Sequence, residues 1–207
     1  MPRNRGRRCT SQVPRQRRSP PAEAETITSP TVFTFGHGTA GAAEITSLLR
    51  GAGVQRLVDV RTAPGSRHNP DSAREAMARW LPEAGIAYQW EKRLGGWRRV
   101  KGESPDVGLR NESFRSYAGY MRTPEFRAGI DDLLVTAAGQ QIAIMCAETV
   151  WWRCHRKMIA DYLTLVRGVE VRHLMHDGKL RPHRPTAEAR VDGDVLVYDA
   201  PSPAVDD

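Results

Sequence analysis

Short apolar runs alternate with amphipathic segments along much of this chain, and this alternation limits the folds that it can adopt. The runs Thr31–Phe35 and Arg56–Val60 have the length and composition of buried strands. Between them, residues 42–50 place apolar side chains at helical spacing. Strands that alternate with helices favour a parallel sheet with right-handed crossovers. We therefore expect an α/β fold, a three-layer Rossmann-like sandwich with a mostly parallel central sheet.

The same patterns predict the other elements. Strands are expected at 31–35, 56–60, 86–90, 142–146 and 169–174, and helices at 42–50, 70–84, 113–121, 124–138 and 153–167. Residues 94–109 are expected to form a long polar loop, and such loops in compact domains are often functional. The predicted organisation is a disordered tail over 1–30, an α/β domain over 31–176, and an extension over 177–207 that includes a hairpin around Asp192–Asp194.

The positive charge of the chain is concentrated at its start. Seven arginines and two glutamates in residues 1–30 account for +5 of the net charge of +7. This stretch is rich in Arg, Pro and Ser and has too few large apolar residues to form a core. It is interpreted either as a solvated tail or as an arm that binds nucleic acid.

The three cysteines, Cys9, Cys146 and Cys154, are too few and too widely spaced for a disulfide framework. The sequence shows no secretory apolar region, and no apolar run approaches the ~20 residues that cross a bilayer. The expectation is a cytoplasmic protein with reduced thiols and no membrane partner.

Motif spacing excludes several common sites. No G-x-G-x-x-G or P-loop follows a strand, so neither a dinucleotide nor a nucleoside triphosphate is indicated and no cofactor is expected. The first arginine after Cys146 is Arg153, one position too far for a C-x5-R phosphatase loop, which also weakens a rhodanese-type interpretation. A metal site formed by Cys, Cys, His and Glu is conceivable, but its spacing matches no standard zinc pattern, and no metal ligand is assigned.

Polar side chains follow three of the predicted strands. His37 follows the first strand, Asp59 and Arg61 end the second, and Cys146 and Glu148 end the fourth. Parallel strands end at one edge of a sheet, where ligands bind in open α/β folds. Each residue also has a structural interpretation, such as a buried ion pair for Asp59 or simple packing for Cys146.

A second polar group opens the helix that follows. Cys154 lies beside His155 and Arg156 near the helix N-terminus, where both the charge and the helix lower a thiol pKa. Trp151 and Trp152 precede it, and at least one of them is expected to reach the crevice or the surface.

Several segments resemble the DUF488 family, a domain of unknown function. They read FTFGHGT, LVDVRTAPGSRHNP, GIAYQWEKRLGG, SFRSYAGYMRTPEF, MCAETVWWRCHR and VRHL, in this order over residues 33–174. The chain departs from the family at Gly38, where Ser is frequent, and in the spacer TVWWR, which lacks a frequent Pro. The resemblance implies an α/β sandwich with a pocket built from the DVR, CAE and CHR segments, and it implies no reaction.

The combined expectation is an enzyme that acts on an anionic substrate, either nucleotide-like or a nucleic acid. The expected catalytic residues are Cys146 or Cys154 as nucleophile, with Glu148 or Asp59 as acid or base, and with His155 and His37. The expected substrate contacts are Arg61, Arg67, Arg156, Tyr88, Gly95, Gly96, Tyr117 and Trp151. The alternatives are a nucleic-acid-binding protein without catalysis and a cysteine-based redox or metal sensor.

Overall fold

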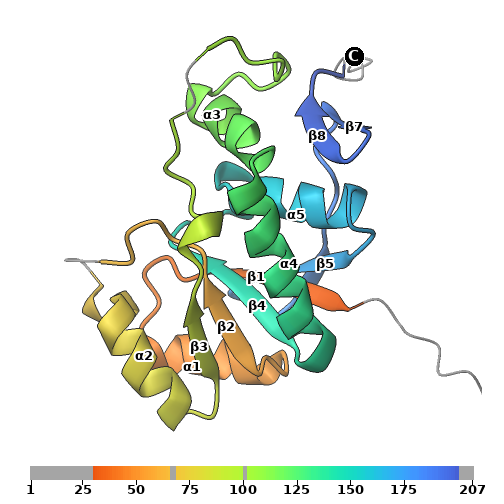
Figure 1. Cartoon of the computed structure of the whole chain (residues 1–207). Helices are drawn as coiled ribbons and strands as arrows, with labels where there is room; N and C mark the ends of the chain where they lie inside the picture. The colour runs from red at the N-terminus through yellow and green to blue at the C-terminus, as the bar shows by residue number, and fades with distance from the viewer. Residues whose placement is uncertain (1–29, 66–68, 100–101, 201–207) are drawn as a thin grey trace, which may run out of the picture.

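The computed structural model describes residues 30–65, 69–99 and 102–200 (Figure 1). Its strands are β1 (Thr31–Gly36), β2 (Arg56–Asp59), β3 (Ala87–Trp90), β4 (Ile142–Cys146), β5 (Glu170–Leu174), β6 (Leu180–Pro182), β7 (Ala189–Asp192) and β8 (Val195–Tyr198). Its α-helices are α1 (Ala42–Gly51), α2 (Arg74–Glu83), α3 (Glu112–Met121), α4 (Pro124–Gly139) and α5 (Arg156–Leu165). Three short 3₁₀ helices, η1 (Pro70–Ser72), η2 (Lys92–Leu94) and η3 (Trp151–Arg153), lie in the connections.

Six strands form the central sheet in the order β3-β2-β4-β1-β5-β6. The first five are parallel, and β6 pairs antiparallel with β5. Strand β4 lies between β1 and β2 although it comes about a hundred residues after them. The central sheet is therefore complete only when the second half of the chain inserts β4 between these two strands. This arrangement confirms the predicted α/β fold with a mostly parallel central sheet.

The two faces of the sheet belong to two separate cores, because strand side chains alternate with a period of two. Val58 and Ile144 face a core that contains residues from α3, α4 and α5. Leu57 and Met145 face the opposite core, which contains residues from α1 and α2. Helices thus cover both faces, and the fold has three layers (Figure 1).

Local sequence accounts for the helix boundaries near the site. Helix α3 starts after Asn111, whose side chain accepts a hydrogen bond from Ser113 N–H. Helix α4 starts with Pro124 after the capping residue Thr123. Helix α5 starts at Arg156 and not at Arg153, because η3 forms a tight turn before it.

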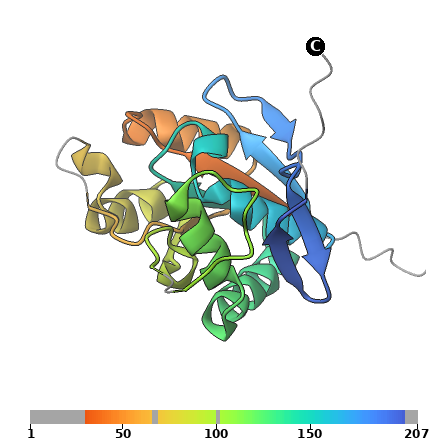
Figure 2. The same cartoon turned by 90° about the horizontal axis from the view of Figure 1, so that it is seen from above.

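The last described part of the chain packs against the α3–α5 side of the domain. Strands β7 and β8 form the predicted hairpin, which lies beside α3 in Figure 1 and away from α1 and α2 in Figure 2. Asp161 of α5, fully buried, accepts hydrogen bonds from His183, Thr186 and Tyr198 of this part of the chain. Strand β6, which no sequence pattern predicted, joins the edge of the central sheet.

Among the described helices, none combines the length and the apolar character that a membrane-spanning segment requires.

Candidate active site at the sheet edge

The ends of β1, β2 and β4 meet at one edge of the sheet. Gly36 pairs with Cys146, and Asp59 pairs with Met145. The residues that follow these strands therefore lie side by side, as the strand order predicts. A cavity of about 260 Å³ opens here, lined by His37, Arg61, Thr62, Ala63, Gly65, Gly96, Trp97, Cys146, Ala147 and His155.

Two thiols share one imidazole nitrogen at the cavity. His155 Nδ1 lies 3.5 Å from Cys154 Sγ and 3.9 Å from Cys146 Sγ. The other ring nitrogen, Nε2, lies 3.2 Å from the carbonyl oxygen of Val60. Because a carbonyl can only accept, His155 donates from Nε2, so Nδ1 can accept a proton from a neighbouring thiol or, once protonated, donate to its thiolate. The backbone carbonyl of Val60, just after β2, thus sets the tautomer of His155, the N-cap residue of α5.

The two thiols differ in exposure and in proton affinity. The pKa of the buried Cys154 thiol lies well below its usual value, because the Cys146 thiol donates a hydrogen bond to it and His155 and Arg156 are close. The pKa of Cys146 is raised, because it holds this shared proton and is largely buried. When Cys154 ionises, the pair therefore shares one proton, which Cys146 holds. Cys146 is the partly exposed sulfur, and it lines the cavity.

Arg156 supplies a buried positive charge beside this pair. It is 1% exposed, and its Nη2 donates to the carbonyl oxygen of Glu148. Its Nε has no hydrogen-bond partner among the described residues, and no carboxylate there forms an ion pair with it. A buried charge without a counter-charge is costly, and the guanidinium interacts electrostatically with both cysteines, where it favours the thiolate form. Gly36 leaves room for the guanidinium, since a Cβ there would lie 2.5 Å from Arg156 Nη2.

Asp59, Arg61 and His37 form a closed buried network. Arg61 Nε lies 2.9 Å from Asp59 Oδ1, and Tyr88 donates to Asp59 Oδ2 over 2.7 Å. Arg61 Nη1 donates to His37 Nε2 over 3.2 Å, while His37 Nδ1 donates to the carbonyl oxygen of Gly38. Burial and then Arg61 lower the pKa of His37 to about 4, so the ring is neutral near pH 7. This network fixes the wall of the cavity and leaves the Arg61 charge balanced by Asp59.

The remaining predicted residues occupy different positions. Glu148 is exposed outside the cavity, and its carboxylate accepts from Val150 N–H. Trp151 stacks on His173 with ring centroids 3.9 Å apart, also outside the cavity. Tyr117 is fully buried, donates to the carbonyl oxygen of Leu94, and places its ring against that of His155. Arg67 and the predicted tail lie outside the described residues.

Gly95 and Gly96 hold the polar loop against the site. A Cβ on Gly95 would lie 2.5 Å from Thr62 Oγ1, and a Cβ on Gly96 would lie 2.5 Å from His155 Nδ1. Only glycine permits these approaches without a shift of the neighbours. The sequence interpretation missed Trp97, the next residue, which lines the cavity; its place between two glycines and two arginines was the available signal.

The site also has the donor atoms of a metal centre. The ligand atoms of Cys146, Cys154 and His155 all lie within 4.8 Å of one another. Two thiolates and one imidazole suit zinc and other soft transition metals, and the carbonyl bond at Nε2 is the usual second partner of a metal-bound histidine.

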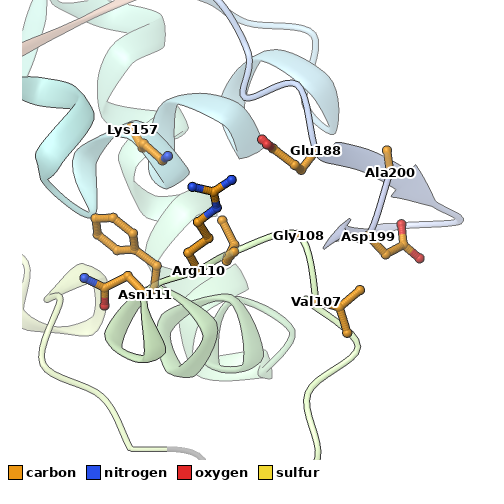
Figure 3. A pocket seen from close by; sticks show the side chains of 10 residues that line it. Val107, Gly108, Arg110, Asn111, Lys157, Glu188, Asp199 and Ala200 are labelled. Atoms are coloured by element: carbon orange, nitrogen blue, oxygen red, sulfur yellow. The ribbon is translucent and has the colours of Figure 1, made fainter. Parts of the chain in front are cut away.

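A separate hollow of about 530 Å³, the hairpin hollow, lies at the start of α3 and α5 beside the β7–β8 hairpin (Figure 3). Figure 3 shows the Arg110 side chain extending toward Lys157 and Glu188. This hollow contains none of the predicted site residues. Its two positive residues, Arg110 and Lys157, are matched by two negative residues, Glu188 and Asp199, so its charge favours neither an anionic nor a cationic ligand.

Comparison with known proteins places the chain in a family without a known reaction. No curated protein and no solved structure matches it. The family model described as "Domain of unknown function DUF488" matches residues 41–163, which is more than half of the chain. The matched range includes Asp59, Arg61, Cys146, Cys154 and His155. This chain therefore belongs to the DUF488 family.

Proposed function

We propose that this protein is a cysteine-dependent enzyme, a hydrolase or a transferase, in which Cys146 is the nucleophile and Cys154 and His155 are its proton partners. The observation that carries the proposal is the position of both sulfurs within 3.9 Å of one imidazole nitrogen, with Cys146 facing a cavity. A nucleophile within reach of a base that a third group orients is the usual arrangement of covalent catalysis. Here the Val60 carbonyl is the orienting group.

Charge supports a thiolate in this cluster. The buried guanidinium of Arg156 lacks a carboxylate partner among the described residues. Its own effect is to lower the pKa of both thiols, although the pKa of Cys146 is raised overall by its hydrogen bond to Cys154. A thiolate and a guanidinium that are buried together compensate each other's charge, and leaving either of them buried alone would cost more. The chemistry needs reduced thiols, so the proposal includes a reducing compartment such as the cytoplasm.

The proposed reaction has two steps. The proton of Cys146 passes to His155 Nδ1 or to the Cys154 thiolate, and the Cys146 sulfur forms a bond to an electrophilic atom of the substrate. The bond to the leaving group breaks, and the leaving group receives the proton. Water or an acceptor then attacks the covalent intermediate, takes the place of sulfur on the substrate, and returns the proton to the cysteine pair.

Alkylation kinetics and a metabolite screen test this proposal together. Every variant carries Cys9→Ser, so that Cys146 and Cys154 are the only thiols that iodoacetamide can label. We expect rapid iodoacetamide labelling at pH 7 that Cys146→Ser abolishes and His155→Asn slows, and turnover of at least one metabolite that Cys146→Ser removes. The matched control is Glu148→Gln, which changes an exposed carboxylate outside the cavity. Labelling at the rate of a free thiol, together with no turnover that depends on Cys146, would contradict the proposal.

A specific observation favours a second candidate function, a metal-dependent protein or metal sensor. The three donor atoms of Cys146, Cys154 and His155 are close enough to hold one ion. Elemental analysis of the purified protein separates the two candidates. One equivalent of a transition metal that disappears in Cys154→Ser would favour the metal, whereas thiols that titrate freely in metal-free protein would favour the nucleophile.

A further inference from the structure

Trp97 is an exposed aromatic side chain that lines the cavity of Cys146 and His155. It is 79% exposed, the largest exposed fraction of any large apolar residue that the structure describes. The other tryptophans have partners: Trp80 and Trp90 donate to carbonyl oxygens, and Trp151 and Trp152 contact each other. Within the described part of the chain, the Trp97 ring has no stacking, cation–π or hydrogen-bond partner. An exposed indole of this kind needs an explanation, because burying it would release water from a large apolar surface.

The loop that carries Trp97 is held in place. Gly95 and Gly96 lie against Thr62 and His155, and the Trp97 N–H donates to Thr62 Oγ1 over 3.1 Å. Arg98 donates to three carbonyl oxygens, those of Lys92, Arg93 and Gly95, and stacks its guanidinium 3.9 Å above the Tyr120 ring. The exposed ring therefore sits on a fixed support, which reduces the entropy that a ligand must overcome to stack on it.

Trp97 lines two hollows at once. One is the cavity of Cys146 and His155. The other, of about 670 Å³, is lined by Gly96, Trp97, Arg98, Arg99, Glu112, Ser113 and Ser116. A ligand whose reactive end reaches Cys146 would thus pass the Trp97 ring and extend into the second hollow.

The second hollow has the polar groups for an anion. Arg98 and Arg99 face one carboxylate, that of Glu112, so its net charge is positive. Arg99 is exposed, and it has no ion pair within the described residues. The hydroxyl groups of Ser113 and Ser116 line the same hollow and can donate to an anionic group. Arg61 and Arg156 are committed to internal contacts, so the external anion is left to Arg99.

We propose that Trp97 and Arg99 form a subsite for a small heteroaromatic anion, of the size of a nucleoside monophosphate, whose ring stacks on the indole and whose anionic group meets Arg99. This inference rests on the proposed function, because it names the substrate class of the same cavity. Stacking on an aromatic side chain accepts any planar base, and an arginine adds the charge complement.

Calorimetric titration with AMP, CMP, GMP and UMP tests the subsite, with ribose 5-phosphate as the probe that lacks a ring. The titrations use the Cys146→Ser protein, so binding is measured independently of thiol chemistry. We expect at least one nucleotide to bind, ribose 5-phosphate to bind much more weakly, and Trp97→Ala to weaken nucleotide binding about tenfold or more. Trp97→Phe should retain most of the affinity, and the matched control Trp152→Ala, an exposed tryptophan that lines neither hollow, should retain all of it. Arg99→Gln should remove the preference for a nucleotide over its nucleoside.

The outcomes separate this inference from the proposed enzyme. No binding by any nucleotide, equal binding of ribose 5-phosphate, or loss of binding in Trp152→Ala but not in Trp97→Ala would overturn the subsite. Binding of single-stranded oligonucleotides without any mononucleotide binding would also overturn it and favour a nucleic-acid-binding protein. Trp97-dependent binding in a protein whose Cys146 is unreactive would support the subsite while removing the cysteine-dependent enzyme.

Discussion

The backbone of Gly96 lies directly against the imidazole ring of His155, so close that a Cβ at residue 96 would be 2.5 Å from Nδ1. This contact joins the loop before α3 to the N-cap residue of α5. It also means that the position of the proposed base depends on a residue without a side chain.

We therefore expect Gly96→Ala to displace either the loop or the His155 ring. The rate of Cys146 alkylation should fall, and the free energy of unfolding should decrease by about 1–3 kcal/mol, as is usual when a methyl group is forced into a packed site. Alkylation kinetics and urea denaturation measure the two effects. The control is Gly51→Ala, where an added Cβ would meet nothing within 4 Å. Equal behaviour of the two variants would contradict the proposed contact.

The buried pair of Asp59 and Arg61 should be a strong determinant of stability. Asp59 is fully buried and Arg61 is 6% exposed, and their closest atoms lie 2.5 Å apart. Asp59→Asn leaves a buried guanidinium without its counter-charge, which typically costs about 3–5 kcal/mol. Urea denaturation should show this loss, whereas Glu75→Gln, in the exposed pair with Arg74, should leave the midpoint nearly unchanged. A midpoint for Asp59→Asn like that of Glu75→Gln would rule out this role.

Arg156 should control the pH at which the thiols react. In Arg156→Met the side chain keeps much of its volume and loses its charge, so the pKa of both Cys146 and Cys154 should rise, because a charge that lowers both is removed. The pH profile of iodoacetamide labelling, in the Cys9→Ser background, should move to higher pH. Arg153→Met is the matched control, since Arg153 is exposed three residues earlier in the chain. A profile that does not move, or that moves equally in the control, would show that the guanidinium charge has no such effect.

Two buried histidines should make the protein less stable in mild acid. Burial lowers the pKa of His173 to about 3 and that of His37 to about 4, with smaller effects from His183 on the first and Arg61 on the second. In the unfolded chain both rings bind a proton near pH 6.5, while in the folded protein they stay neutral until much lower pH. The unfolded state therefore binds more protons below pH 6.5, and stability falls as the pH is lowered from about 6.5 toward 4.

The expected slope is up to about 1.4 kcal/mol per pH unit for each histidine. Urea denaturation at a series of pH values measures it. His173→Gln should reduce the slope of stability against pH by the contribution of one histidine. This reduction is expected whatever the effect of the substitution on stability at pH 7. An unchanged slope in this variant would show that His173 binds its proton equally in both states.

The sequence alone was sufficient for most of the elements, though not for β6 or for the break at Ala73 before α2, and for the edge of the sheet where the site lies. Apolar runs and helical spacing are local, so they predicted the five parallel strands and the five helices. Parallel strands end together, so the positions of His37, Arg61 and Cys146 at one cavity also followed from the pattern.

Only the tertiary structure decided what these side chains do to one another. Whether Arg61 meets a substrate or Asp59, and whether Glu148 faces the cavity or solvent, depends on side-chain direction, which no periodicity contains. The tautomer of His155 comes from the carbonyl of Val60, just after β2 and 95 residues earlier in the chain. Trp97 reaches the site because two glycines let its loop approach Thr62 and His155. These are contacts between distant segments, and they exist only after the sheet has brought the segments together.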